Sequence, residues 1–173
     1  METERILLRP WREEDAEALY RLASDPEVGP RAGWPPHRSV DESREVIRTL
    51  FSNGHTWAIV WKATNEAIGC ICYYPHSESN ISIGPHDAEV GYWVARPWWN
   101  RGIATEALLA IINYCLDAKG FHTLWADYQP SNPASGRVLQ KCGFRDTGRV
   151  NRLSHLQAGN NLSVRIMQLD RHS

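Results

Sequence analysis

Residues 99 to 105, which read Trp-Asn-Arg-Gly-Ile-Ala-Thr, carry the clearest chemical pattern in the sequence. They lie between a strand-like run and an amphipathic helical segment. A helix N-terminus exposes unpaired backbone N–H groups and carries about half a positive charge, and glycine lets a ligand approach the backbone closely. We therefore expect a pyrophosphate-like anion to bind the backbone amides of Asn100, Arg101, Gly102, Ile103 and Ala104. Many strand–turn–helix units bind nothing, so a purely structural turn is the alternative.

The elements that position this turn follow from hydrophobic periodicity and from turn residues. Strand-like runs occupy residues 6–9, 55–62, 67–74, 88–95, 121–128, 144–150 and 162–169. Helical spacing of apolar residues covers residues 13–23, 40–51, 102–119 and 132–143. This order predicts an α+β (mixed α/β) domain with one central sheet. At 173 residues the chain fits a single domain that spans residues 1–173.

Two helix starts have recognisable capping residues. Ser39, with Glu42 three residues later, is typical of a capping box. Asn132-Pro133 suits a helix opening, because asparagine is a good N-cap and proline fits the first helical position. Residues 24–36, with four prolines and two glycines, are expected to form a loop, as are residues 75–85 and 151–161.

The composition excludes several classes of protein. The 19 basic and 20 acidic residues give a net charge of -1, which argues against a nucleic-acid partner. No apolar stretch approaches about 18 residues and no signal pattern opens the chain, so we expect a cytoplasmic protein without a membrane partner. The cysteines and the seven histidines lack metal-ligand spacing, so no metal is expected. We expect buried, reduced side chains at Cys70, Cys72, Cys115 and Cys142.

The stretch from residue 89 to residue 106 resembles the acetyl-CoA motif of the GNAT superfamily of N-acetyltransferases. That motif reads Gln/Arg-x-x-Gly-x-Gly/Ala, and residues 99–104 match it at Gly102 and Ala104. Trp99 at the first position is typical of the RimJ/RimL-like branch, which contains ribosomal-protein N-terminal acetyltransferases. Asn100 replaces a glycine of that branch. Residues 5–16 and 132–144 resemble its opening segment and its second cofactor motif, so the resemblance covers nearly the whole chain.

The resemblance implies a GNAT-like fold, with a mostly antiparallel, twisted sheet of about seven strands and about four helices, splayed between strands 4 and 5. It implies acetyl-CoA as the co-substrate. In the family a backbone amide on strand 4 polarises the thioester carbonyl, and we expect a bulge near Gly91 or Trp93. The residues implied to bind coenzyme A are Tyr92, Trp93, Val94, Trp99, Asn100, Arg101, Gly102, Ile103, Ala104, Thr105, Asn132 and Ser135.

Two side chains are candidates for proton transfer within this resemblance. Glu89 is the candidate general base, acting through water, because burial among apolar neighbours would raise its pKa toward a useful value. A solvated strand-end glutamate or an ion-pair partner is the alternative. Leu139 stands where many family members carry a catalytic tyrosine, so Ser135 is the candidate general acid. Its alternative is an ordinary residue of the first helical turn.

The implied activity is transfer of an acetyl group to a primary amine by direct attack in a ternary complex, and the first expectation for the acceptor is a protein or peptide N-terminal α-amine. Deprotonating an α-amine near pH 7.4 costs about 0.5 kcal/mol, whereas deprotonating a lysine-like amine costs about 4 kcal/mol. A single carboxylate base is therefore better suited to an α-amine acceptor. A small amine, such as a polyamine, an antibiotic or an amino-acid-like molecule, is the alternative. A non-catalytic acyl-CoA-binding sensor is the alternative of another class.

The acceptor site is expected to include Trp34 and Glu89, with residues 24–39 and 75–87 deciding which amine binds. Five acidic residues in or beside these segments are candidates to attract a cationic acceptor, namely Asp25, Glu27, Asp41, Glu78 and Asp87. Relatives are often dimers, so a homodimer is one expectation for the assembly.

Overall fold

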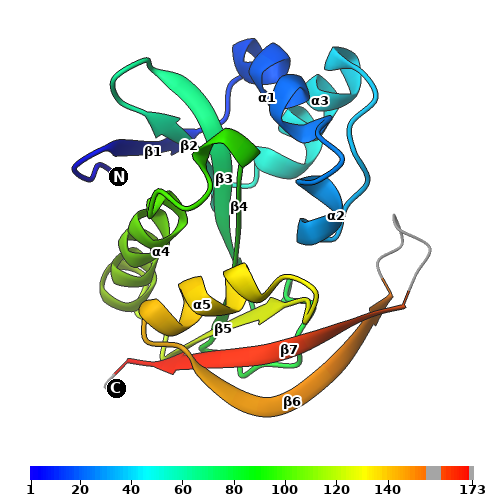
Figure 1. Cartoon of the computed structure of the whole chain (residues 1–173). Coiled ribbons are helices and arrows are strands. Elements are labelled where there is room, and N and C mark those ends of the chain that lie inside the picture. The colour runs from blue at the N-terminus through cyan, green and yellow to red at the C-terminus, as the bar shows by residue number, and fades with distance from the viewer. Residues whose placement is uncertain (155–160, 172–173) are drawn as a thin grey trace.

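The computed structural model describes residues 1–154 and 161–171, and it contains one seven-stranded sheet with the strand order β1-β2-β3-β4-β5-β7-β6 (Figure 1). Its strands are β1 (Ile6–Pro10), β2 (Thr56–Trp61), β3 (Glu66–Pro75), β4 (Ala88–Val94), β5 (Thr123–Tyr128), β6 (Arg145–Ser154) and β7 (Asn161–Asp170). Its α-helices are α1 (Ala16–Ala23), α2 (Gly29–Ala32), α3 (Val40–Val46), α4 (Ile103–Asn113) and α5 (Pro133–Lys141). The predicted α+β class and seven-stranded sheet are confirmed.

The sheet opens between β4 and β5, as the resemblance implies. Among the described residues these two strands form the one parallel pair of the sheet, and they pair only at Ala88 with Leu124 and at Glu89 with Trp125. Beyond Glu89, β4 stays paired with β3 on its other side, up to the pairing of Val94 with Gly69. The edge of β4 that faces β5 is therefore left without a strand partner over most of its length.

The predicted bulge near Gly91 or Trp93 is wrong. The antiparallel register between β3 and β4 runs without a shift from Pro75 opposite Ala88 to Gly69 opposite Val94. A shift lies instead in the neighbouring pair, between Ile59 and Val60 of β2. The splay therefore comes from the early end of the β4–β5 pairing and not from an extra residue in β4.

Two hydrophobic layers hold the sheet from opposite faces. The larger core joins α4 and α5 to the sheet, with Leu108, Ile111 and Leu139 completely buried. On the other face, α1 and α3 cover the N-terminal half around Leu19 and Ile47. Figure 1 shows α1, α2 and α3 grouped at the end of the molecule that lies opposite the long pair of β6 and β7.

The segment between β3 and β4, predicted to be a polar loop, contributes a third core. Ile81 and Ile83 are buried there against Val164 and Ile166 of β7, with the Trp125 ring packed beside them. The loop is therefore a cover for the C-terminal half of the sheet, on the same face as Trp125. All four cysteines are buried and free, as predicted.

Several predicted boundaries differ from the structure. The expected loop at residues 24–36 contains the short helix α2, so the described residues form five α-helices where about four were expected. Residues 151–154 and 161, predicted as loop, belong to β6 and β7, because strand pairing uses the backbone and tolerates polar side chains on an outer strand. The rest of that predicted loop, residues 155–160, lies outside the described residues. Within residues 1–154 and 161–171, no helix is long and apolar enough to cross a membrane.

Candidate active site

The turn between β4 and α4 has the geometry of an anion cradle. Asn100 and Gly102 both adopt left-handed backbone conformations, with φ of 59° and 75°, and α4 starts at Ile103. The first N–H of this helix to find a backbone acceptor is that of Glu106, which bonds to the carbonyl of Gly102 at 3.0 Å. Among the described residues, the N–H groups of Gly102, Ile103, Ala104 and Thr105 have no hydrogen-bond acceptor. These donors fit a ligand with phosphate oxygens.

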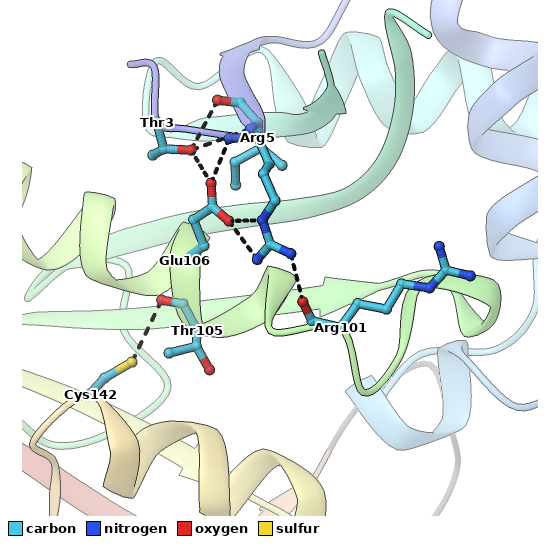
Figure 2. A network of polar contacts seen from close by, with 7 residues as sticks. Thr3, Arg5, Arg101, Thr105, Glu106 and Cys142 are labelled. Atoms are coloured by element: carbon cyan, nitrogen blue, oxygen red, sulfur yellow. Dashed lines mark hydrogen bonds and ion pairs between the residues drawn. The ribbon is translucent and has the colours of Figure 1, made fainter. Parts of the chain in front are cut away.

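A network around Glu106 fixes this turn to the start of the chain (Figure 2). The Glu106 carboxylate accepts hydrogen bonds from Thr3 Oγ1 at 2.5 Å, from the Arg5 backbone N–H at 2.9 Å and from Arg5 Nε at 2.7 Å. The same Arg5 guanidinium donates to the backbone carbonyl of Arg101 at 2.9 Å. Figure 2 shows the Arg101 side chain directed away from this network. The predicted cofactor residue Arg101 is thus held through its backbone.

Trp99 connects the turn to the end of β4. Its indole Nε1 donates to the carbonyl of Val94 at 2.7 Å, and the Arg31 guanidinium lies 5.1 Å from the Trp99 ring centre. Trp99 therefore positions the turn as a packed side chain, which explains why a tryptophan is compatible with the first position of the motif. Whether Trp99 also contacts coenzyme A stays a prediction.

Tyr92 of β4 reaches across the splay to the first turn of α5. Its hydroxyl lies 3.1 Å from the Ser135 carbonyl and 3.1 Å from Ser135 Oγ. Burial, partly offset by the hydrogen bond with Ser135, raises the pKa of Tyr92, so the phenol keeps its proton at neutral pH. Asn132 occupies the predicted N-cap position, but its side chain makes no capping hydrogen bond. The structure thus brings Tyr92 and Ser135 together, both within reach of the opening between the strands.

The alternation of β4 places its side chains on two opposite faces of the sheet. Val90 and Val94 face the large core with α4, whereas Trp93 packs beside the core under α1 and α3. A Cβ on Gly91 would meet Cys72 Sγ at 3.3 Å. We call the face of β3, β4 and β5 that carries Cys72, Glu89, Gly91, Trp93 and Trp125 the acceptor face, because it lies opposite the helix α4 that forms the anion cradle.

Glu89 is buried on the acceptor face, but it is not a carboxylate among apolar neighbours alone. Its Oε2 accepts a hydrogen bond from Ser79 Oγ at 2.7 Å and one from the backbone N–H of Asn80 at 2.9 Å. Only 7% of Glu89 is exposed. The prediction that Glu89 has only apolar neighbours is wrong, because the loop before β4 folds over the carboxylate and supplies two hydrogen-bond donors.

Asp127 of β5 is a second carboxyl on this face that the sequence reasoning missed. Leu124 and Ala126 face the large core, so the alternation of β5 puts Trp125 and Asp127 on the acceptor face. Burial first, and then the charge of Glu89, raises the pKa of Asp127 to about 7. Strand alternation over residues 121–128 was the signal that could have separated Asp127 from the core positions.

The predicted acceptor residue Trp34 lies at the edge of this face. Its ring meets the Trp93 ring edge-on, with 5.5 Å between the ring centres. Gly29 of α2 makes room for it, since a Cβ there would lie 2.6 Å from the Trp34 ring. Gln129 Nε2, which follows β5, donates to the Pro30 carbonyl at 2.9 Å and ties α2 to the far side of the splay.

The five acidic residues proposed to attract a cationic acceptor are all engaged by neighbours. Three form ion pairs, in the combinations Asp25–Arg96, Glu27–Arg31 and Asp41–Arg44, and Glu78 lies within hydrogen-bond distance of His55 Nε2 at 2.9 Å. Asp87 accepts hydrogen bonds from the Gly84 N–H and from Trp125 Nε1, each at 3.0 Å. Glu89 and Asp127 are therefore better candidates than these five residues to meet the acceptor.

Comparison with known proteins agrees with this geometry. The acetyltransferase (GNAT) domain family matches residues 5–145, so the chain belongs to the GNAT acetyltransferase family. It is 30% identical over 151 residues to the uncharacterized N-acetyltransferase p20 of Bacillus licheniformis, covering 84% of this chain and 82% of p20. It is also 35% identical over 71 residues to the [ribosomal protein uS5]-alanine N-acetyltransferase of Escherichia coli, covering 40% of this chain and 37% of that protein.

Among solved structures, the chain is similar to an acetyltransferase of the GNAT family from Bacillus anthracis, with a TM-score of 0.85 and 21% sequence identity. The match covers 100% of this chain and 99% of that one. This similarity confirms the fold. The family match and the N-acetyltransferase relatives show that the chain is an acetyltransferase.

Proposed function

We propose that the protein transfers the acetyl group of acetyl-CoA to a primary amine, with a protein or peptide N-terminal α-amine as the acceptor. The observation that carries the donor half is the cradle at the start of α4, where four consecutive N–H groups lack an acceptor among the described residues. The observation that supports the acceptor half is the pair of carboxyls, Glu89 and Asp127, on the opposite face of the opened sheet.

Acetyl-CoA would supply the acetyl group and a thiolate leaving group. The turn at Asn100–Ala104 is proposed to hold its phosphates, and the unpaired edge of β4 at Tyr92–Val94 offers backbone groups to the pantetheine arm and to the thioester carbonyl. A carboxylate on the acceptor face removes a proton from the amine. The Tyr92 and Ser135 hydroxyls, 3.1 Å apart, are placed to return a proton to the departing sulfur.

The energetics favour an α-amine as the acceptor. Such an amine has a pKa of roughly 7.7–8.0, close to that of a carboxyl raised to about 7, whereas a lysine amine near 10.4 holds its proton about 3.4 kcal/mol more tightly. The similarity to a ribosomal-protein alanine N-acetyltransferase supports the same class of acceptor. A cytoplasmic location would fit a protein acceptor of that kind and is proposed with it.

The direct test incubates the protein with acetyl-CoA and a panel of amines, followed by mass measurement of the products. The panel contains peptides with free N-termini, the same peptides with blocked N-termini and an internal lysine, spermidine, and an aminoglycoside. A mass increase on free N-termini alone supports the proposal, and modification only of spermidine or the aminoglycoside would move the function to a small amine. Tight coenzyme A binding with no product from any amine would identify a sensor.

The proton donor is tested by replacing Ser135 with alanine. We expect kcat to fall about 100-fold, in the range that general acid catalysis contributes, while coenzyme A affinity stays within about threefold. Ser163→Ala, at an exposed serine of β7, is the matched control and should leave kcat unchanged. If Ser135→Ala keeps full kcat while Tyr92→Phe loses it, the phenol and not the serine is the donor.

A further inference from the structure

Asp127 lies where the sheet opens. The last pairing between β4 and β5 joins Glu89 to Trp125, and Asp127 is the next residue of β5 on the same face. The matching position on β4 is Gly91, two residues after Glu89. The two strands have separated at this level, so Asp127 stands on one wall of the opening and Gly91 on the other.

The missing side chain at Gly91 keeps this level of the opening uncrowded. A Cβ there would point toward Cys72 Sγ at 3.3 Å and toward the Tyr74 ring at 3.9 Å. Gly91 therefore lies on the acceptor face, on which Cys72 and Tyr74 of β3 also lie. An amine that approaches the thioester through the acceptor face therefore passes between Gly91 and Asp127.

The two carboxyls on this face differ in how they are held. Glu89 is buried, and its Oε2 is fixed by the Ser79 hydroxyl and the Asn80 N–H. Asp127 is half-buried, and its carboxyl makes no hydrogen bond or ion pair with residues 1–154 or 161–171. A carboxyl that must accept a proton and then release it needs this freedom more than one that is tied down by two donors.

We propose that Asp127 is the group that takes the proton from the acceptor amine, with Glu89 serving as a fixed neighbouring anion. This inference rests on the proposed acetyl transfer and deepens it by assigning the base. The negative charge of Glu89 disfavours a second charge on Asp127, and burial acts in the same direction, which accounts for the pKa of about 7. A base of that pKa is half deprotonated near neutral pH and is matched to its task.

The proton and electron balance is complete with the groups present. The ammonium of the acceptor gives one proton to the Asp127 carboxylate, and the freed lone pair forms the C–N bond as the C–S bond breaks. The thiolate takes a proton from the hydroxyl pair of Tyr92 and Ser135. The acylated nitrogen gives its second proton back to that pair, which leaves a neutral amide, and Asp127 returns its proton to water. For an α-amine the proton transfer to Asp127 is unfavourable by about tenfold, and for a lysine amine by more than a thousandfold, so the assignment also selects the α-amine class.

The ionisable groups around Asp127 are few. Glu89 faces it from β4, and Tyr74 and Cys72 line the same face from β3. On β7, Val164, Ile166 and Gln168 share this face and carry no ionisable group. Asp170, at the far end of β7, also lies on this face opposite Thr123, and it accepts hydrogen bonds from Thr123 Oγ1 and from the Arg145 guanidinium. Beside Trp125, the Arg149 guanidinium of β6 lies 5.5 Å from the ring centre, and Asp87 holds the indole N–H. Of these groups, only Glu89 acts on Asp127 strongly enough to shift its pKa.

The test compares the pH dependence of kcat/KM for a peptide acceptor in Asp127→Asn, Glu89→Gln and the wild-type protein. We expect Asp127→Asn to lower kcat/KM about 100-fold or more and to remove the rising limb near pH 7. Glu89→Gln should keep that limb and move it to lower pH by about half a unit or more, since a neighbouring negative charge is lost. Asp117→Asn, at an exposed aspartate after α4, is the matched control and should change neither the rate nor the limb.

The reverse pattern would overturn the proposal, with the limb lost in Glu89→Gln and only shifted in Asp127→Asn, because Glu89 would then be the base. Carboxyl carbon NMR titration of the free protein gives a second readout that does not depend on turnover. We expect a resonance that titrates near pH 7 and is absent in Asp127→Asn. In Glu89→Gln the midpoint of its titration should move to lower pH. Coenzyme A affinity checks that each variant is folded. A wild-type protein inactive toward all amines would refute the proposed function, whereas an active wild type with an unchanged Asp127→Asn profile refutes only this assignment.

Discussion

At the scale of single residues, the site depends on backbone conformations that few side chains tolerate. Asn100 adopts a φ of 59° in the anion cradle, a region that asparagine enters more readily than most residues. The sequence showed asparagine in place of a glycine of the branch, and the structure explains the replacement. A left-handed residue is needed there, and asparagine provides it without the full flexibility of glycine.

We predict that Asn100→Val destabilises the protein by about 1–2 kcal/mol and weakens coenzyme A binding at least about tenfold, whereas Asn100→Gly keeps both near the wild-type values. Calorimetric titration with coenzyme A and thermal unfolding measure the two effects. Asn65, in the turn between β2 and β3, has a φ of 56° and gives a matched control. Asn65→Val should lose similar stability and keep its affinity, and an equal loss of affinity in both variants would argue against the cradle.

At the scale of elements, the cradle is held by a segment far away in the sequence. Arg5, just before β1, links the Glu106 carboxylate in the first turn of α4 to the carbonyl of Arg101 (Figure 2). Burial alone would raise the pKa of Glu106, but hydrogen bonds from Thr3 and Arg5 outweigh it and the pKa is lowered. The sequence reasoning included Glu106 in the motif but gave it no role.

We predict that Glu106→Gln destabilises the protein by about 1–3 kcal/mol and weakens coenzyme A binding, because Arg5 loses a charged partner and no longer fixes the turn. The pKa of Glu106 is lower in the folded than in the unfolded chain, so its contribution is present above about pH 4.3 and is lost as the pH falls through the lower folded value. Glu106→Gln should therefore weaken the acid dependence of the free energy of unfolding, as measured by denaturant titration between about pH 3 and 7.

The control for this prediction is Glu13→Gln. Glu13 forms an ion pair with Arg48, and about half of each side chain is exposed, so solvent screens the pair. Its removal should leave both the free energy of unfolding and the coenzyme A affinity nearly unchanged. Equal effects of Glu13→Gln and Glu106→Gln would show that the network in Figure 2 does not position the cradle.

At the scale of the whole molecule, one core connects the two halves of the opened sheet. Leu108 and Ile111 of α4 are completely buried in it together with Leu124 of β5 and Ile71 of β3. Few backbone hydrogen bonds join β4 to β5, so packing against α4 and α5 is what holds the halves at a fixed opening. The width of the cleft is therefore set by side-chain packing.

We predict that Leu108→Ala lowers the free energy of unfolding by about 2–5 kcal/mol and also weakens coenzyme A binding, since the cavity loosens the packing across the opening. Leu109, the next residue, is 45% exposed, and Leu109→Ala should stay within about 0.5 kcal/mol of the wild type. Denaturant unfolding followed by two spectroscopic probes measures both. Separate transitions for the two halves of the sheet would contradict the single-domain prediction.

Much of the fold could be predicted because local patterns and tertiary packing agree. Alternation and helical spacing located all seven strands, and the cap at Ser39 is present, with its Oγ accepting from the Glu42 N–H at 3.0 Å. The loops were the weak point. Two isoleucines, Ile81 and Ile83, are too few to predict that the β3–β4 loop packs on the sheet. Helix α2 has only four residues, among prolines and glycines, and was therefore not predicted. Both segments are ordered by what they pack against.

The sequence by itself determined the family, the sheet and the position of the turn before α4 that is predicted to bind an anion, because those depend on the order of elements and on residues that are neighbours along the chain. Only the tertiary structure placed Asp127 beside Glu89, tied Glu89 to Ser79 and brought Tyr92 to Ser135. Each of these pairs joins different elements or loops, and its pKa shift or hydrogen bond depends on burial and distance. Those quantities exist only once the sheet has opened and the helices and the β3–β4 loop have packed on its faces.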